Sequence, residues 1–190
     1  MKLANSSREA KKILHDGNIL VDGVVRRDYK FPVGVFDVIT IPKIDLSYRV
    51  FLDAKQRLSL RKISDPEVKL CRINDKTILK GGNTQLNLHD GSNIVSDEYS
   101  YQTSDSVILT LPERKVVKHL TYKPGSLALV IGGAHSGELA TIEDVRKTRS
   151  AMPNMTSLHS SYDFETIEDY VFVVGKGTPE IETPGGDVVD

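Results

Sequence analysis

The sequence predicts an α+β protein in which β-structure dominates. One amphipathic helix is expected near the N-terminus, and nearly every later apolar run is short. Turn dipeptides such as Asp22-Gly23, Gly81-Gly82 and Asp90-Gly91 separate these runs. Short strands with such frequent turn signals indicate small antiparallel sheets or barrels.

The first element is a helix that begins after Ser6. Ser6 and Glu9 have the spacing of a capping box, in which each side chain accepts a hydrogen bond from the backbone N–H of the other residue. Gly17 is expected to end the helix, because glycine readily adopts the left-handed conformation that follows a helix C-terminus.

The two sides of this helix differ in chemistry. At about 100° per residue, Ala10, Ile13 and Leu14 share an apolar side that is suited to packing. The opposite side carries three cations and a histidine, namely Arg8, Lys11, Lys12 and His15.

A tight hairpin and a basic loop follow the helix. Residues 18–21 and 24–25 are two extended runs joined by Asp22-Gly23, a pair that favours the positive φ angles of a tight turn. The next residues include the candidate ligands of an anion, namely Arg26, Arg27, Tyr29 and Lys30. A solvated surface is the ordinary explanation of one charge run, but here two elements that fold together both carry cations. This arrangement favours an anionic partner, with RNA as the leading candidate.

Two aromatic residues, Tyr29 and Phe31, lie among these cations. Aromatic side chains interleaved with cations are typical of surfaces that stack on unpaired RNA bases. Phe31, which precedes Pro32, is better explained as a core anchor. Tyr29 is open to either role, and we include it among the candidate RNA-binding residues.

The charge is distributed unevenly along the chain. The net charge is −1, which by itself argues against a nucleic-acid-binding protein. Residues 1–62, however, hold 13 Lys and Arg against 7 Asp and Glu, a balance of +6, and the remaining residues have a balance of −7. A basic first part of this kind indicates nucleic-acid contact by that part of the chain.

Successive short strands are expected beyond the basic loop. The run from Phe36 to Ile41 is expected to close the first domain. Strict alternation in residues 57–61 predicts a strand with Leu58 and Leu60 facing inward and the charges outward. The other strands expected in this region are 48–52, 68–73, 77–79, 84–88, 106–111 and 115–122, with a turn at Asn74-Asp75.

A glycine-bounded loop, Gly132–Gly137, divides the last apolar region. Residues 127–131 and 138–142 form β-runs on either side of it, and a turn that a side chain would block explains Gly137. Three further elements are expected: a loop over 146–156, a helical turn over 165–170 and a strand over 171–174. The Pro-, Gly- and acid-rich tail of residues 178–190 is expected to be disordered.

The order of helix, HDGN, ILVDG, VVRRDYKFPVG and FDVI resembles the S-four-type RNA-binding domain, which contains the alpha-L motif. The longer stretch VDGVVRRDYKFPVGVFDVITI is similar to one family, the S-four-e ribosomal proteins of the small subunit in archaea and eukaryotes. DAKQRLSLRKI and VKLCRINDKTIL match the central β-rich domain of that family in pattern. The two β-runs around the glycine loop resemble the KOW motif of SH3-like barrels, with Gly137 at its key glycine position.

The resemblance implies a domain order. Residues 1–44 would form the S-four-type RNA-binding domain, 45–120 the central β-rich domain and 121–177 the SH3-like KOW domain, followed by the tail of 178–190. Family members carry several dozen further residues before this point, in a strongly basic segment that ends with the first helix of the RNA-binding domain. The resemblance therefore implies an N-terminally truncated domain in which Ala10, Ile13 and Leu14 lack one packing partner.

The resemblance also implies a function. The chain would be a structural constituent of the small ribosomal subunit that binds ribosomal RNA, contacts neighbouring ribosomal proteins and works in the cytoplasm. The alternative is a non-ribosomal RNA-binding or transcription-associated factor built from the same modules. An RNA-modifying enzyme ranks last, because no catalytic domain of adequate size or motif remains in residues 42–175.

No catalytic, metal or cofactor site is expected from the residues themselves. The loop ending at Gly137 has the glycine spacing of a phosphate loop, but Glu138 and Leu139 stand where lysine and Ser/Thr are required. The five histidines show no metal-ligand spacing, and Cys71 is the sole cysteine. No apolar run approaches the roughly 20 residues that span a bilayer. We therefore expect neither a membrane nor a small-molecule substrate as a partner.

Overall fold

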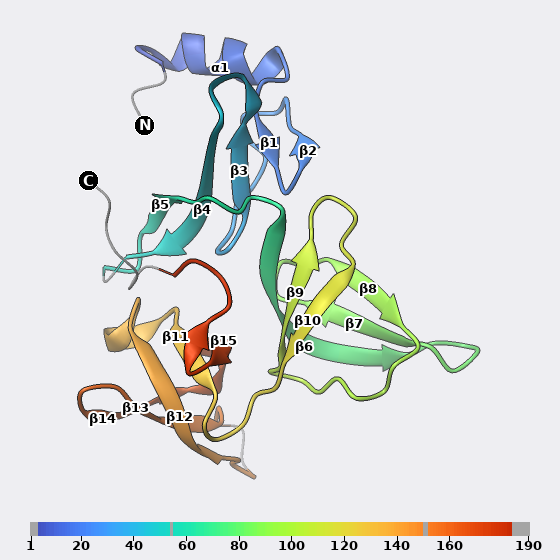
Figure 1. Ribbon diagram of the computed structural model, residues 1–190, viewed down its shortest axis with the longest axis vertical. Helices are drawn as coiled ribbons and strands as arrows, with labels where there is room; N and C mark the ends of the chain where they lie inside the picture. The colour runs from blue at the N-terminus through green and yellow to red at the C-terminus, as the bar shows by residue number, and fades with distance from the viewer. Residues whose placement is uncertain (1–3, 54, 150–151, 184–190) are drawn as a thin grey trace.

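The computed structural model describes residues 4–53, 55–149 and 152–183. Within these residues the protein has one α-helix and three antiparallel sheets, so the prediction of a mostly-β fold is confirmed (Figure 1). The helix lies at one end of the molecule, beside the first sheet, and the third sheet lies at the other end. The helix has nine residues, far short of the roughly 20 that cross a bilayer, and no helix of the described residues is suited to that role.

The helix α1 (Ser7–His15) begins and ends as its sequence predicts. Ser6 Oγ accepts a hydrogen bond from the Glu9 N–H at 3.2 Å. The reciprocal half of the capping box differs, because Glu9 Oε2 accepts from the N–H of Asn5, one residue before the N-cap. At the other end Gly17 has a φ of +74°, and its N–H donates to the Leu14 carbonyl oxygen. The N–H of Asn18 donates to Ile13, which completes a Schellman motif.

The first sheet has the strand order β2-β1-β3-β4-β5. Its strands are β1 (Leu20–Val21), β2 (Val24–Val25), β3 (Val38–Ile41), β4 (Leu46–Leu52) and β5 (Leu58–Lys62). Asp22 and Gly23 both have positive φ, which confirms the predicted turn. The strand predicted from Phe36 begins two residues later, because Phe36 itself has a φ of +69°.

β3 does not close the first unit of the fold. It pairs with β4 through a short 3-10 turn, η1 (Pro42–Ile44), and β4 pairs with β5. The domain boundary expected at residue 44 therefore falls inside the first sheet.

The prediction that Leu58 and Leu60 face inward is wrong. Their exposed fractions are 60% and 42%, whereas the neighbouring Ser59 and Arg61 are only half-exposed. β5 is the edge strand of its sheet, so alternation identified the strand but not which of its faces the protein covers.

The second sheet has the order β10-β9-β6-β7-β8. Its strands are β6 (Val68–Ile78), β7 (Thr84–Leu88), β8 (Asn93–Ser96), β9 (Ser106–Thr110) and β10 (Val116–Leu120). The turn predicted at Asn74-Asp75 is wrong, because β6 runs through it without interruption. The register of β6 against β7 shifts between Ile73 and Asp75, so Asn74 is the extra residue of a β-bulge.

The third sheet has the order β14-β13-β12-β11-β15-β16. Its strands are β11 (Leu127–Val130), β12 (Leu139–Arg146), β13 (Met155–His159), β14 (Asp163–Ile167), β15 (Val171–Lys176) and β16 (Thr178–Pro179). The 3-10 turns η2 (Gly133–His135) and η3 (Glu168–Tyr170) connect its strands. The helical turn predicted over 165–170 is thus confined to η3, since residues 163–167 pair with β13.

The first residues of the predicted disordered tail are ordered. β16 pairs with β15, the Ile181 side chain is buried in the main core, and the Glu182 carboxylate accepts a hydrogen bond from the Ser64 N–H. The prediction of disorder is therefore wrong for residues 178–183, and residues 184–190 lie outside the described part of the chain.

One core cluster joins the three sheets. Phe36 and Phe51 of the first sheet region pack with Phe172 of β15, and the ring of His89 from the β7–β8 turn completes the group. The centroids of neighbouring rings are 5.0–6.1 Å apart, within the range of favourable aromatic pairs. This shared core fixes the first sheet against the other two.

Candidate nucleic-acid interface

All four candidate residues of α1 are exposed, as the helical wheel predicts. They are Arg8, Lys11, Lys12 and His15. The apolar side, formed by Ala10, Ile13 and Leu14, is half-buried and borders a hollow of about 760 Å³. The hollow is closed from the sheet side by Ile19, Ile41 and Ile44. The expectation of one further packing partner for this side of the helix stays a prediction.

The hairpin places the basic loop beside the helix. The N–H of Arg26 donates to the Ile19 carbonyl oxygen at 3.0 Å and so closes the β1–β2 ladder. The guanidinium of Arg27 lies over Gly17, where a Cβ would be 3.4 Å from its Nε. The helix C-terminus and the start of the loop are therefore neighbours.

Tyr29 joins the two basic segments. Its ring centroid is 4.2 Å from Lys11 Nζ of the helix and 5.7 Å from Lys30 Nζ of the loop. Both distances are within the range of cation–π contacts. The tyrosine side chain is 55% exposed, so its ring is held between two cations and remains open to solvent.

Arg26 is partly withdrawn from the surface. Its guanidinium lies 4.0 Å from the centroid of the Phe31 ring, and its Nε is buried without a hydrogen-bond partner among the described residues. Phe31 is half-buried, so it is less of a core anchor than the sequence predicts and serves as a platform for Arg26.

Some cations elsewhere in the described chain form ion pairs, but the cations of this surface do not. Within the part of the chain that the structure describes, no ion pair involves the six cations of this surface, which are Arg8, Lys11, Lys12, Arg26, Arg27 and Lys30. On the second and third sheets Arg72 pairs with Asp169, and Arg146 pairs with Glu165. Unpaired like charges on adjoining elements repel one another and attract an anion. We call these six cations, with His15 and Tyr29, the basic surface.

A buried lysine from the second sheet holds the loop that carries this surface. Lys69 Nζ lies 2.6 Å from an Asp22 oxygen, 2.6 Å from an Asp37 oxygen and 2.8 Å from an Asp90 oxygen. Asp22 is in the hairpin turn, Asp37 precedes β3, and Asp90 is in the β7–β8 turn. The Lys69 side chain is only 3% exposed. Three carboxylates from three segments thus converge on one ammonium group.

The same carboxylates also accept backbone hydrogen bonds. Asp22 Oδ1 accepts from the Val38 N–H at 2.9 Å, and Asp37 Oδ2 accepts from the Gly34 N–H at 2.7 Å. The two ends of the basic loop are therefore tied to each other and to β6. Sequence analysis missed Lys69, although a lysine between Val68 and Leu70 in an apolar strand is itself a signal that a buried counter-charge is needed.

The electrostatics of this cluster are mutually stabilising. Burial by itself would lower the pKa of Lys69, but the acidic groups around it, Asp22 and Asp37 among them, raise that pKa above its usual value. Burial would also raise the pKa of Asp90, but hydrogen bonds from Lys69 and Ser92 lower it well below its usual value. The lysine is therefore charged in the folded protein, as is Asp90.

Gly137 lies between β11 and β12 with a φ of +90°. Its N–H donates to the Val130 carbonyl oxygen at 2.7 Å. A Cβ at this position would meet the Leu52 carbonyl oxygen at 3.8 Å, an ordinary contact. The backbone conformation, and not crowding by a neighbour, is the reason that the position favours glycine.

Comparison with known proteins places these features in a family. The model of ribosomal family S4e matches residues 44–116, and the S4 domain model matches residues 1–39. Small ribosomal subunit protein eS4 of Archaeoglobus fulgidus is 49% identical over 177 residues, which cover 93% of this chain and 75% of that protein. The protein of the same name from Methanothermobacter thermautotrophicus is 45% identical over 190 residues, which cover 98% of this chain and 78% of that protein.

A solved structure agrees with these matches. The crystal structure of the 30S ribosomal protein S4e from Thermoplasma acidophilum matches with a TM-score of 0.80 and 32% sequence identity. The match covers 93% of this chain and 90% of that chain. Sequence and fold thus agree over nearly the whole length, and the chain belongs to the ribosomal protein family S4e.

Proposed function

We propose that the chain is a structural constituent of the small ribosomal subunit and that it binds ribosomal RNA through the basic surface. The names of its relatives support the ribosomal assignment. The observation that carries the proposed site is the set of six cations without ion-pair partners among the described residues, carried by α1 and the adjoining loop, with the exposed ring of Tyr29 between Lys11 and Lys30.

The mechanism is the docking of a preformed surface onto folded RNA. The lysines and arginines contact phosphate oxygens, and these contacts supply most of the affinity without reading the base sequence. Tyr29 stacks on an unpaired base, because its ring is exposed and every base has a π-face. Lys69 and its carboxylates keep the loop in the shape that the RNA meets, so little ordering is needed on binding.

The rest of the chain braces this surface on neighbouring RNA and proteins. We assign residues 1–44, with α1 and β1 to β3, to an S-four-type domain of the alpha-L kind. Residues 45–120, which include the second sheet, form a central domain, and residues 121–177 with the third sheet form a KOW-type, SH3-like domain. The β11–β12 hairpin with a positive-φ glycine at residue 137 supports the KOW assignment. The work of such a protein is structural, without turnover or a cofactor, and is done in the cytoplasm with the ribosome.

Charge reversal tests the RNA-binding role of the basic loop. We expect Arg26→Glu, Arg27→Glu and Lys30→Glu together to abolish binding to transcribed small-subunit ribosomal RNA at moderate salt. At lower salt, where residual binding is measurable, the plot of log K against log salt concentration should be less steep by about 2. Each lost phosphate contact reduces the magnitude of that slope by about 0.7–0.9. Filter binding over a salt series measures both quantities.

A matched control separates this site from general charge. Lys80→Glu, Lys123→Glu and Lys176→Glu together make the same change in net charge at exposed positions outside the first sheet. This control should keep most of the affinity and the salt slope. Equal losses in the two triple variants, or unchanged binding in the first, would place the RNA site elsewhere.

Sedimentation tests the ribosomal assignment directly. A tagged chain expressed in an archaeal cell should travel with the small subunit in a gradient. Consistent sedimentation at the top of the gradient would overturn the assignment in favour of a free RNA-binding factor.

A further inference from the structure

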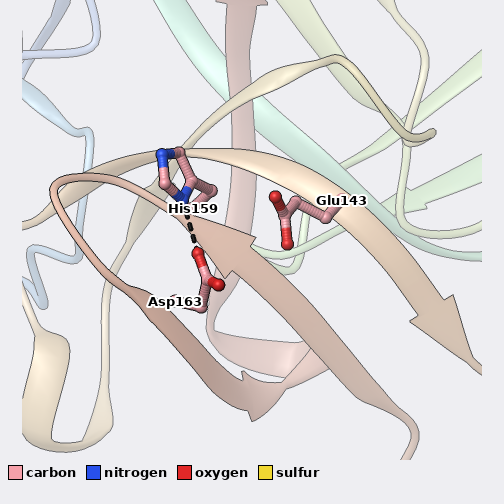
Figure 2. A group of neighbouring side chains, drawn as sticks. All are labelled: Glu143, His159 and Asp163. Atoms are coloured by element: carbon pink, nitrogen blue, oxygen red, sulfur yellow. Dashed lines mark hydrogen bonds and ion pairs between the residues drawn. The ribbon is translucent and has the colours of Figure 1, made fainter.

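Three potential metal ligands meet on one exposed face of the third sheet. They are Glu143 of β12, His159 at the end of β13 and Asp163 at the start of β14 (Figure 2). One donor atom from each lies within 4.8 Å of the others. This face belongs to the end of the molecule away from α1 and the basic surface (Figure 1).

Strand register brings the three side chains together. His159 lies directly opposite Asp163 in the β13–β14 ladder, and its Nδ1 is 2.5 Å from Asp163 Oδ1. On its other side His159 is opposite Thr141 of β12. The register of β12 shifts between Ile142 and Asp144, so Glu143 is the extra residue of a bulge. Bulges re-aim side chains, and here the carboxylate is directed toward the imidazole of the adjacent strand.

The backbone beneath the three donors is firmly held. Ile142 and Leu158 are paired across the strands and buried in the main core, with exposures of 1% and 0%. Phe164, next to Asp163, belongs to the same core. The donors therefore project from a rigid sheet and not from a mobile loop, as a metal site requires.

We propose that Glu143, His159 and Asp163 form a binding site for a divalent transition-metal ion of the Zn²⁺ class. One imidazole and two carboxylates are ligands that Zn²⁺ accepts, whereas Mg²⁺ and Ca²⁺ favour all-oxygen sites. The metal takes the place of the proton that His159 Nδ1 shares with Asp163 Oδ1, and that proton leaves to solvent. All three side chains are exposed, so water completes the coordination shell.

The ordinary alternative is an exposed ion pair between His159 and Asp163. A second histidine, in the turn η2 between β11 and β12, provides the comparison. His135 Nδ1 is 3.3 Å from Glu138 Oε1 and 3.1 Å from the Tyr162 hydroxyl, so it has one carboxylate neighbour instead of two. An ion pair alone predicts equal, weak metal affinity at both histidines, and the proposed site predicts a preference for His159.

Calorimetric titration with ZnCl₂ tests the proposal on the full chain, freed of any polyhistidine tag. At about pH 7.5 we expect one equivalent to bind. His159→Ala should weaken binding at least tenfold, Asp163→Asn and Glu143→Gln should each weaken it about tenfold, and His135→Ala should leave it unchanged. MgCl₂ and CaCl₂ should give no comparable heat. Buried Cys71 does not compete.

Two results would overturn the site. Unchanged Zn²⁺ affinity in His159→Ala, or an equal loss in His135→Ala, would mean adventitious binding only. Imidazole NMR signals give an independent measurement, because Zn²⁺ should shift those of His159 before those of His135. The RNA affinity of all four variants should match that of the unmodified chain, so the outcome is separate from that of the proposed RNA site.

Discussion

Replacing Lys69 with methionine removes the charge at the centre of the carboxylate cluster while keeping most of the side-chain volume. Three carboxylates then remain close together with side-chain exposures of 9%, 10% and 13%. Removal of one partner from a buried ion pair typically lowers the free energy of unfolding by about 3–5 kcal/mol. We expect a loss in this range at pH 7, because three carboxylates share one cation.

The pH dependence of this loss has a defined sign. The pKa of Lys69 is raised in the folded protein, so its stabilising contribution is complete below its unfolded value of 10.5 and is constant through the neutral range. The pKa of Asp90 is lowered, so its contribution is complete above the ordinary value of 3.8 and is lost at more acid pH. In Lys69→Met the unpaired carboxylates take up protons more readily. The difference in the free energy of unfolding between this variant and the unmodified chain should therefore become smaller at acid pH.

Urea denaturation at pH 7 and at about pH 4 measures both effects. Lys62→Met is the matched control, because Lys62 is an exposed lysine of β5 and its replacement should change stability by no more than about 0.5 kcal/mol. Folded Lys69→Met should also bind RNA more weakly, since the basic loop loses its anchor. Equal urea midpoints for Lys69→Met and Lys62→Met would refute the reasoning.

Two further predictions concern the core and the edge strand. Burial lowers the pKa of His89, whose Nδ1 accepts from the Arg72 N–H and whose Nε2 donates to the Val35 carbonyl oxygen, so the contribution of the neutral ring is complete above 6.5 and is lost as pH falls. As the pH is lowered from about 7 to about 5, the urea midpoint of the unmodified chain should therefore decrease, and that of His89→Gln should decrease less. Parallel curves of urea midpoint against pH for the two proteins would contradict this. Leu58→Ser should change the free energy of unfolding by no more than about 0.5 kcal/mol, whereas fully buried Leu70→Ala should lower it by about 2–5 kcal/mol in the same urea assay. A large loss in Leu58→Ser would mean that the exposed face of β5 is covered.

Local chemistry accounts for most of the secondary structure that the sequence predicted. The boundaries of α1 follow from Ser6 and Gly17, and the β1–β2 turn follows from Asp22-Gly23. Each of these signals acts within a few residues. β14 was missed because its acidic residues resemble a polar turn, and only pairing with β13 makes that segment a strand.

The candidate RNA-binding residues were chosen from charge and spacing, and their placement needed the fold. The structure brings Lys11, Tyr29 and Lys30 into contact range and turns Arg26 onto Phe31. Their role in RNA binding stays a prediction. No spacing in the sequence pointed to the Glu143 cluster, because its members come from three strands and a bulge aligns one of them.

The sequence by itself determined the mostly-β class, the helix–hairpin–basic loop order and the family. These properties depend on interactions between residues close in the chain or on direct similarity to relatives. The tertiary structure alone decided which face of β5 is covered, that β6 continues through Asn74, that residues 178–183 are ordered, and that Lys69 holds the basic loop. The physical reason is that burial and buried charge depend on partners from distant segments: Lys69 is stable in the interior only because the hairpin turn, the start of β3 and the β7–β8 turn each supply a carboxylate.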